Sequence, residues 1–220
     1  MKIYAINGGP RKQHNTAKLL QAALDGAAAA PCAEAVETEM IHLYDLNYNG
    51  CVSCFSCKRK GGKSYGRCAV KDDLTPVLEK LAQADGVIFG SPIYFGNITG
   101  KLRSFFERLM FAYFVYDENY SSLAPKRMPT AFVYTMNVDS ALIEKYGYRQ
   151  TLQGMEMFAG RLFGEPQVMH ACNTYQFDDY SKYECASYSE SEKAAYRDAH
   201  FPQELEEARK IGAAMVAASK

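Results

Sequence analysis

The sequence lacks an excess of charge, a long apolar run and an export segment, and each absence excludes a class of protein. It has 25 lysine and arginine residues against 25 aspartate and glutamate residues, whereas proteins that bind nucleic acid usually carry a basic excess. No apolar stretch approaches the ~20 residues that cross a bilayer. Residues 1–7 pass directly into a strand-like pattern, without the hydrophobic region and cleavage site of a secretion signal. We therefore expect a cytoplasmic protein that binds neither nucleic acid nor membrane.

Familiar catalytic and nucleotide-binding motifs are also missing. The four histidines are scattered, and no Ser–His–Asp or H-E-x-x-H arrangement is present. The first glycine-rich loop does not contain G-x-G-x-x-G, which argues against a nicotinamide-type Rossmann fingerprint. Gly62-Lys63-Ser64 imitates the end of a P-loop, but Cys57 stands where the first glycine belongs and no strand precedes it. We predict no catalytic acid, base or nucleophile.

The sequence does contain an alternating pattern of strands and helices. Of its 220 residues, 48% are hydrophobic and 23% are charged, which is enough to form a real core. We find no repeat and no linker, so we predict one domain over residues 1–220. Asn15 and the pair Asp72-Asp73 are the expected helix N-caps. The predicted strands are 3–6, 36–43, 87–89, 130–135 and 167–171, and the predicted helices are 15–30, 72–84, one ending near 113, 141–163 and 191–218.

Five strands that alternate with helices indicate an α/β protein with an open parallel sheet and helices on both faces. Ligands of such sheets bind outside the carboxyl ends of the strands. The loops after the first, third and fourth strands are therefore the places where we expect chemistry. A stretch rich in Tyr, Ser and Asp, residues 173–190, has no clear period. The sequence leaves three roles open for this Tyr-rich segment: a lid, a subunit contact or a simple excursion.

The loop after the first strand has the composition of an anion site. Its glycines allow a ligand to approach the backbone, and the helix that follows offers free N–H groups and a positive dipole. Arg11, Asn15 and Thr16 add side-chain donors that suit a phosphate. An ordinary turn with a capping asparagine is the alternative interpretation.

The loop after the third strand has the composition of a wall for a planar ring. Tyr94 and Phe95 lie between Pro92 and Gly96, and Asn97 follows with an amide that can form hydrogen bonds. Such a flat apolar surface suits a heterocycle. Aromatic side chains that simply pack on the sheet are the alternative. Taken with the first loop, this one indicates a site for a phosphorylated cofactor that carries a ring.

Four of the seven cysteines are clustered in residues 47–71, which we predict to be a loop after the second strand. Cys51, Cys54 and Cys57 follow one another at intervals of three, and Cys68 is the fourth. Iron–sulfur clusters use this close triple spacing. Four thiolates also suit zinc, which more often binds two separated C-x2-C pairs, and a loop can also carry free thiols. The sequence leaves these three alternatives open, with a 4Fe–4S cluster as the leading one.

Paired motifs in the first 110 residues carry a family resemblance. They are Gly8-x-Pro10-Arg11 with Asn15-Thr16, then Ser91-Pro92-Ile93-Tyr94-Phe95-Gly96, Gly100-Lys101-Leu102 and Glu107-Arg108. These motifs resemble the flavodoxin-like NAD(P)H-dependent FMN reductase family. The C-x2-C-x2-C group with Cys68 and Lys71-Asp72-Asp73 resembles the iron–sulfur flavoprotein branch of that family, although the gap before Cys68 is longer here. The last hundred residues are similar only in topology.

The resemblance implies a fold and a set of cofactor contacts. The fold is a flavodoxin-like, doubly wound five-stranded sheet in the order 2-1-3-4-5. Arg11, Asn15 and Thr16 would bind the FMN phosphate, although Gly9 stands where the family commonly has a serine hydroxyl. The cluster ligands would be the four cysteines named above. The implied FMN-binding residues are Gly9, Pro10, Arg11, Asn15, Thr16, Pro92, Ile93, Tyr94, Phe95, Gly96, Asn97, Thr135, Met136 and Asn137.

The leading hypothesis is an FMN-dependent oxidoreductase with a 4Fe–4S cluster. The resemblance implies that reduced nicotinamide, NAD(P)H, or a ferredoxin-like protein supplies electrons and that a small molecule accepts them. It also implies a homodimer or homotetramer that brings the cysteine loop of one subunit near the flavin of another. The first alternative is a cluster-free NAD(P)H-dependent FMN or quinone reductase. The second is a zinc-stabilised binding module without turnover, because fold alone never proves activity.

Overall fold

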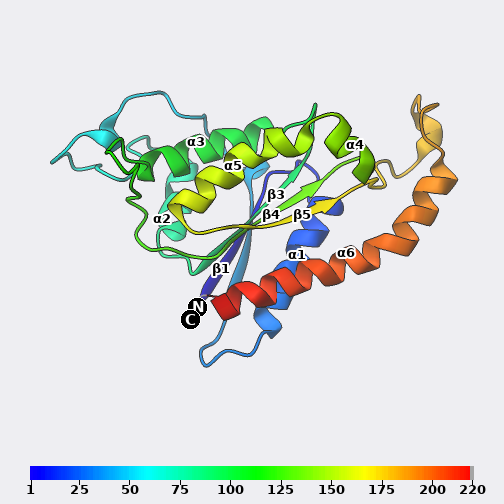
Figure 1. Cartoon of the computed structure of the whole chain (residues 1–220), viewed down its shortest axis with the longest axis horizontal. Coiled ribbons are helices and arrows are strands. Elements are labelled where there is room, and N and C mark those ends of the chain that lie inside the picture. Colours follow the sequence, from blue (N-terminus) through cyan, green and yellow to red (C-terminus); the bar gives the residue numbers. More distant parts are fainter. Residues whose placement is uncertain (219–220) are drawn as a thin grey trace.

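A computed structural model describes residues 1–218 of the protein, and a five-stranded parallel sheet lies at its centre (Figure 1). The strands lie in the order β2-β1-β3-β4-β5, which confirms the predicted fold. The observed β4 and β5 have the predicted bounds, because their apolar runs end at polar residues or turns. The strands are β1 (Lys2–Asn7), β2 (Glu37–His42), β3 (Gly86–Pro92), β4 (Thr130–Thr135) and β5 (Gln167–Ala171).

Helices cover both faces of the sheet. In Figure 1, α3, α4 and α5 lie on one side of the strands, and α1 and α6 lie on the other. Side chains of α2 pack into the same core as those of α3 and α5. The helices are α1 (Asn15–Ala29), α2 (Leu74–Leu81), α3 (Gly100–Tyr113), α4 (Ser140–Lys145), α5 (Tyr148–Leu162) and α6 (Glu190–Ala218), with short 3-10 helices η1 (Leu43–Asp45), η2 (Ser56–Lys58) and η3 (Tyr180–Lys182).

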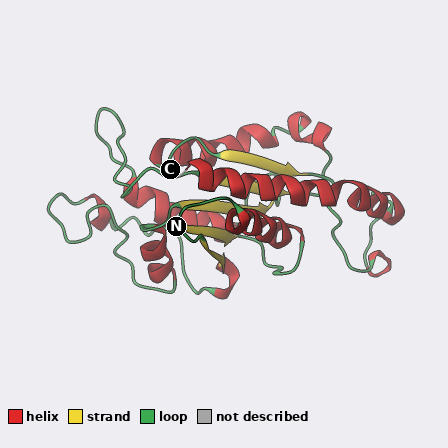
Figure 2. Cartoon of the chain, turned by 90° about the horizontal axis from the view of Figure 1, so that it is seen from below, coloured by secondary structure: helices red, strands yellow, loops and turns green. Residues whose placement is uncertain are grey.

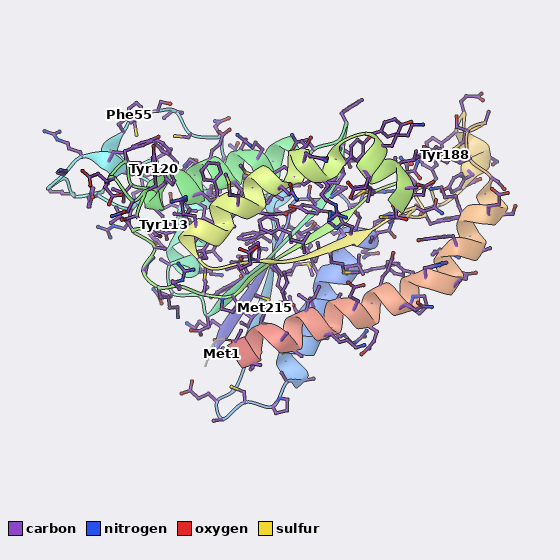
Figure 3. All side chains as sticks on the ribbon, viewed as in Figure 1. Met1, Phe55, Tyr113, Tyr120, Tyr188 and Met215 are labelled. Atoms are coloured by element: carbon purple, nitrogen blue, oxygen red, sulfur yellow. The ribbon has the colours of Figure 1, made fainter. Side chains whose placement is uncertain are left out.

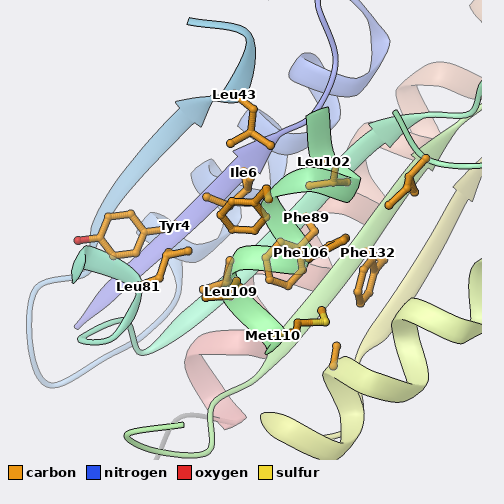
Figure 4. Close-up of a cluster of buried hydrophobic side chains, with 14 of the residues drawn as sticks. Tyr4, Ile6, Leu43, Leu81, Phe89, Leu102, Phe106, Leu109, Met110 and Phe132 are labelled. Carbon is orange, nitrogen blue, oxygen red and sulfur yellow. The ribbon is translucent and has the colours of Figure 1, made fainter. Parts of the chain in front are cut away.

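Aromatic rings fill the core between the sheet and α3 (Figure 4). The ring of Phe89 in β3 lies 4.9 Å from Phe106 of α3 and 5.3 Å from Phe132 of β4, measured between centroids. Tilted and edge-on pairs of this kind are worth about 0.5–1.5 kcal/mol beyond the apolar area that they bury. This packing holds α3 against the strands whose ends form the loops considered below.

The other face is closed by direct backbone contact between α1 and α6. A Cβ atom added at Gly212 of α6 would lie 1.8 Å from the carbonyl oxygen of Ala23 in α1, and one added at Gly26 would lie 2.1 Å from that of Arg209. No real Cβ tolerates such distances, so glycine is required at both positions. The two glycines let α6 pack closely along α1 and fix the C-terminal helix on the sheet.

Three local predictions were wrong. The third strand, predicted over 87–89, continues to Pro92 because Gly90, Ser91 and Pro92 pair with β4. The helix predicted over 141–163 is broken into α4 and α5, because Gly147 adopts a left-handed conformation with φ of 68°. Asn15 is not an N-cap: His14 occupies that position without a side-chain cap, and the Asn15 amide is used elsewhere. The apolar pattern continues on both sides of Gly147, so periodicity alone did not reveal the break.

Hydrogen bonds tie the carboxyl ends of β1, β3 and β4 together. The N–H of Gly8 donates to the carbonyl of Gly90 at 2.8 Å, and the N–H of Ile93 donates to that of Thr135 at 2.9 Å. The three loops that the sequence singled out therefore begin side by side at one edge of the sheet. None of the helices within residues 1–218 is long and apolar enough to cross a membrane.

A candidate cofactor cavity and a cysteine loop

A cavity of 310 Å³ lies at this edge of the sheet, between the loops after β1, β3 and β4. Eleven of the fourteen residues predicted to bind FMN line it. Phe95, Gly96 and Asn97 are not among its lining residues: Phe95 is fully exposed, and the Asn97 side-chain oxygen accepts from the N–H of Ile98 at 2.9 Å. The predicted residues that the structure brings together are Gly9, Pro10, Arg11, Asn15, Thr16, Pro92, Ile93, Tyr94, Thr135, Met136 and Asn137.

A chain of buried polar contacts shapes the loop after β1. Asn7, which is fully buried, accepts from the N–H of Gly9 at 2.9 Å through its side-chain oxygen. The Asn7 amide nitrogen lies 2.9 Å from Nδ1 of His42, the last residue of β2. A Cβ at Gly9 would lie 3.1 Å from that Asn7 oxygen and 3.2 Å from Cδ of Pro92. The absence of a side chain at Gly9 therefore matches the tight packing around it.

The side chains predicted to bind phosphate face this cavity, and each has a partner in the structure. The hydroxyls of Thr16 and Thr135 lie 2.7 Å apart. Arg11 donates through Nη1 to the carbonyl of Gln176 at 2.6 Å, and the Asn15 amide donates to the carbonyl of Tyr175 at 2.9 Å. The Tyr-rich segment therefore lies directly on the predicted phosphate loop.

The donors and the wall fit a phosphorylated ring. The N-terminus of α1, the Arg11 guanidinium and the buried Thr16 hydroxyl supply positive charge and hydrogen-bond donors at one end. Pro92 and Ile93 supply apolar surface, and half-exposed Tyr94 supplies an aromatic ring. A flavin mononucleotide has both features, and these residues suit it.

Sequence reasoning missed one wall of the cavity. Thr174, Gln176, Phe177 and Tyr183, all from the Tyr-rich segment, also line it. Their density of aromatic residues is the only signal that the sequence carries, because the segment has no periodicity. The sequence therefore leaves the role of this segment open.

Lys193 of α6 is a second residue that the sequence did not reveal. It is only 3% exposed, and its ammonium donates to the carbonyl of Asn137 at 2.9 Å and also to the Asn137 side-chain oxygen. Burial lowers the pKa of this ammonium. A buried cation therefore holds the loop after β4 that closes the cavity.

The four clustered cysteines line a small cavity of 20 Å³ in the loop after β2. Cys57 is buried, Cys54 is exposed, and the other two, Cys51 and Cys68, are intermediate. Within residues 1–218, no three His, Cys, Asp or Glu side chains are grouped closely enough to hold a metal ion. The donor set has the chemistry that an iron–sulfur cluster requires, and the four thiols share one cavity without converging on one centre.

Arg108 of α3 joins the two ends of the cysteine loop. Its Nε donates to Sγ of Cys68 at 2.8 Å, and its Nη1 and Nη2 donate to the Asp72 carboxylate at 2.7 and 3.2 Å. The same nitrogens donate to the carbonyls of Asn49 and Val70 at 3.1 and 3.2 Å. The guanidinium, 2% exposed, has thus an acceptor for each of its five N–H groups. Asp72, predicted as a helix start, also accepts from the N–H of Leu74.

The rest of the cysteine loop lies along α3 as well. The N–H of Cys51 donates to the Glu107 carboxylate at 3.2 Å. The Lys58 ammonium donates to the carbonyls of Phe111 and Phe114 at the C-terminal end of α3, where a cation is favourable. The ring of Phe55 meets that of Phe111 edge-on, with centroids 6.0 Å apart. A further cavity of 370 Å³ opens beside Cys68, between this loop, α2 and α3.

The cofactor cavity and the cysteine loop lie toward opposite ends of α3. Thr99, the N-cap of α3, donates to the carbonyl of Gly8 at 2.7 Å, which places that end beside the cavity. The residues that hold the cysteine loop are 107–114, about 10–20 Å further along the helix at ~1.5 Å per residue. Figures 1 and 2 show long loops at both ends of the molecule, the cysteine loop at one end and the Tyr-rich segment at the other.

Comparison with known proteins identifies a family model and relatives that match part of this chain. Residues 1–162 match a family model described as NADPH-dependent FMN reductase. An iron–sulfur flavoprotein of Methanocaldococcus jannaschii is 39% identical over 108 residues, which is 49% of this chain and 51% of the relative. An iron–sulfur flavoprotein of Archaeoglobus fulgidus is 38% identical over 108 residues, which is 49% of this chain and 48% of the relative. Each match therefore covers only about half of the curated relative.

The fold has a counterpart among solved structures. An NAD(P)H:quinone oxidoreductase from Methanothermobacter marburgensis superimposes with a TM-score of 0.65 at 16% sequence identity, covering 97% of this chain and 96% of that one. At this identity the likeness concerns the fold alone. The Tyr-rich segment and α6 lie beyond the residues that the family model matches.

Proposed function

Since this chain belongs to the NADPH-dependent FMN reductase family, we propose that it is an FMN-dependent oxidoreductase. Electrons would come from NAD(P)H or from a ferredoxin-like protein and would pass to a small acceptor. The observation that carries this proposal is the 310 Å³ cavity between three loops of the sheet. Hydrogen-bond donors that suit a phosphate lie at one end of it, and a flat apolar wall lies at the other.

The residues of the chain bind and orient the cofactor in this proposal. Arg11, Asn15 and Thr16 bind the phosphate, and Pro92 to Tyr94 support the ring. Asn137, held by the Lys193 ammonium at 2.9 Å, closes the cavity. FMN supplies the redox chemistry when it is bound, and the protein supplies binding, orientation and electrostatics. No side chain is assigned as a catalytic acid or base.

We further propose that Cys51, Cys54, Cys57 and Cys68 hold a 4Fe–4S cluster. Two observations support this: the four thiols line one cavity, and the two relatives described above, each matched over about half of this chain, are iron–sulfur flavoproteins. The distance along α3 between the cysteine loop and the flavin cavity of the same chain favours electron transfer between subunits. We therefore propose a homodimer or homotetramer in which the cluster serves a partner's flavin.

A cluster-free FMN or quinone reductase is the second candidate. It is favoured by one observation, namely that no three metal-binding side chains are grouped in residues 1–218. The two candidates share the flavin and differ in iron, so a single preparation can separate them.

The test is a visible spectrum of anaerobically purified protein with assays of iron and acid-labile sulfide. The cluster proposal predicts flavin bands over a broad background that dithionite bleaches, with about four irons per flavin. Cys54→Ser should remove the iron and leave the flavin, whereas Cys32→Ser, outside the loop, should change neither. Flavin without iron would favour the second candidate. Protein that binds no added FMN would overturn both.

A further inference from the structure

The Tyr-rich segment (residues 173–190) is attached at both ends to the loop after β4, which closes the cofactor cavity. At its start, the N–H of Asn173 donates to the carbonyl of Val138 at 2.8 Å, and that of Thr174 donates to Met136 at 3.0 Å. Just beyond its end, Lys193 donates to the carbonyl of Asn137 at 2.9 Å. Figure 3 shows the segment, with Tyr188 labelled, projecting at the beginning of α6. Both ends are therefore fixed, and the segment forms a closed excursion over the cavity.

The middle of the segment accepts hydrogen bonds from two of the side chains that are predicted to bind the phosphate. The carbonyl of Gln176 accepts from Arg11 at 2.6 Å and the carbonyl of Tyr175 accepts from the Asn15 amide at 2.9 Å. The partners of each bond are more than 150 residues apart in the sequence. Both acceptors are backbone atoms, so their positions depend on the conformation of the segment and not on which side chains stand there.

Tyr180 fixes that conformation. It is 6% exposed, and its hydroxyl accepts from the N–H of Gln176 at 3.0 Å. Its ring lies 4.9 Å from that of Tyr175 and 5.1 Å from that of Phe177, between centroids. The same Phe177 ring stacks on Tyr183 at 4.1 Å, and both of these line the cavity. One tyrosine thus supports the Tyr175–Gln176 peptide, whose carbonyl accepts from Asn15. It also supports Gln176 itself, whose own carbonyl accepts from Arg11, and the aromatic wall beside them.

These bonds leave donors free for an anion. Arginine has five N–H groups and an asparagine amide has two, and each uses one on the segment. Holding a long, flexible side chain in one orientation before the ligand arrives reduces the entropy that binding must lose. The two carbonyls therefore orient the side chains of Arg11 and Asn15 before a phosphate binds, and each side chain keeps N–H groups free to donate to that phosphate.

We propose that Tyr180 is a positioning residue for the FMN phosphate. It acts through the Gln176 and Tyr175 carbonyls, which orient Arg11 and Asn15, so that the Tyr-rich segment contributes to phosphate binding without touching the phosphate. This inference rests on the proposed FMN site. It goes beyond that site, because it adds a device from a part of the chain that lies outside the residues matched by the family model.

The experiment compares FMN with riboflavin, which has the same ring system and no phosphate. Dissociation constants are measured by the change in flavin fluorescence when apo-protein is added to each flavin. Tyr180→Phe removes one hydroxyl and keeps the ring, so it should raise the dissociation constant for FMN about fivefold, the value of one hydrogen bond. It should leave the constant for riboflavin unchanged. Tyr188→Phe, in the same segment but not lining the cavity, is the matched control and should change neither.

A double-mutant cycle tests the route. If Tyr180 acts through Asn15 and Arg11, then Tyr180→Phe should have a smaller effect on FMN affinity in an Asn15→Ala/Arg11→Ala background than in the wild type. A purely structural loss would add to the effect of removing Asn15 and Arg11 and would weaken the binding of riboflavin and FMN alike. Equal loss for both flavins, or full additivity, overturns the proposal.

A measurement on the wild-type protein covers the case in which Tyr180→Phe does not fold. Limited proteolysis within residues 173–190 should be slowed more by FMN than by riboflavin at equal saturation. Only FMN has a phosphate that binds Arg11 and Asn15, the two side chains that are hydrogen-bonded to the segment. Equal protection by the two flavins contradicts the proposal. A wild-type protein that binds neither flavin would overturn the proposed function itself, so the two failures are distinguishable.

Discussion

The cofactor cavity takes its shape from the ends of strands, whereas the cysteine loop takes its shape from the side chains of one helix. At the cavity, backbone bonds such as Gly8 to Gly90 and Ile93 to Thr135 hold neighbouring loops together. At the cysteine loop, the corresponding bonds come from Glu107, Arg108 and the cation of Lys58. The same helix, α3, supports both regions from its opposite ends.

This difference determines how each region should respond to substitution. A loop held by strand ends distributes its support over many backbone bonds, and no single side chain removes them. A loop held by one guanidinium concentrates its support, because Arg108 alone makes contacts on both sides of the cysteines. The cysteine loop should therefore be sensitive to one substitution, and the cavity should lose individual ligand contacts without losing its shape.

Arg108→Met is expected to have the largest effect. It removes the partner of Asp72, whose side chain is only 18% exposed, and leaves several acceptors at the loop ends without a donor. Breaking a buried ion pair on one side costs about 3–5 kcal/mol. The free energy of unfolding, measured in urea, should fall by that order, and iron incorporation should fall with it. FMN affinity in protein that remains folded should change little.

The control is Arg103→Met, one turn earlier on α3. The side chain of Arg103 is 53% exposed and pairs with Glu107 at 3.5 Å, so its loss should cost less than ~1 kcal/mol. If both substitutions lower the free energy of unfolding equally, then Arg108 does not support the cysteine loop more than an exposed residue of α3 does. If Arg108→Met also abolishes FMN binding at low denaturant, the two regions are not independent.

The sequence predicted the framework of the cavity because the strand–loop–helix order determines where strand ends meet. Apolar runs bounded by glycine and proline placed β3, β4 and β5, and parallel order brought their loops to one edge. The sequence could not show that Arg108 binds Asp72. Both were visible as charges, Asp72 as a helix start and Arg108 within an apolar helix face. Their pairing depends on a tertiary approach across 36 residues of chain.

Arg11→Ala should have the next largest effect, and it tests the other region. A charge-assisted hydrogen bond is worth about 1.5–3 kcal/mol, so FMN affinity should fall tenfold to a hundredfold while riboflavin affinity is unchanged. The neighbouring Lys12→Ala is the control, since Lys12 pairs with exposed Asp45 and does not line the cavity. Titrating the apo-protein of each variant with FMN and with riboflavin measures the two affinities. A loss of iron in Arg11→Ala would contradict the independence of the two regions.

The rest of the cavity was beyond sequence reasoning for a different reason. Phe177, Tyr180 and Tyr183 come from a segment with no period, so no pattern assigns them a face. Lys193 lies in the first turn of α6, a helix that looks solvent-exposed by composition, yet Lys193 is buried and its ammonium donates hydrogen bonds to Asn137. Phe95 and Asn97 differ in the opposite way: their motif is intact, but Phe95 adopts a left-handed conformation with φ of 52°, and neither residue lines the cavity.

The smallest expected effect is a pH dependence of the free energy of unfolding that arises from His42, beside the loop after β1. Burial lowers the pKa of His42 from its ordinary value of 6.5, with Lys12 also lowering it and Asp45 opposing. With the Asn7 oxygen accepting from Gly9, the amide must donate to Nδ1 of His42, which requires a neutral ring. A lowered pKa means that the folded protein binds this proton less readily than the unfolded chain. Its contribution to stability is therefore complete above pH 6.5 and declines as the pH falls below that value.

His42→Asn keeps an acceptor for the Asn7 amide but does not titrate, so it isolates this contribution. Between pH 7.5 and 5.5, the free energy of unfolding of apo-protein should fall more in the wild type than in His42→Asn. The excess should be less than about 1 kcal/mol, the value of one hydrogen bond. Burial also lowers the pKa of His14, which lines the same cavity, but His14 is present in both proteins and cancels in the comparison. Identical pH profiles would mean that the loop after β1 keeps its shape without the His42 contact, and that backbone bonds between strand ends are sufficient to hold it.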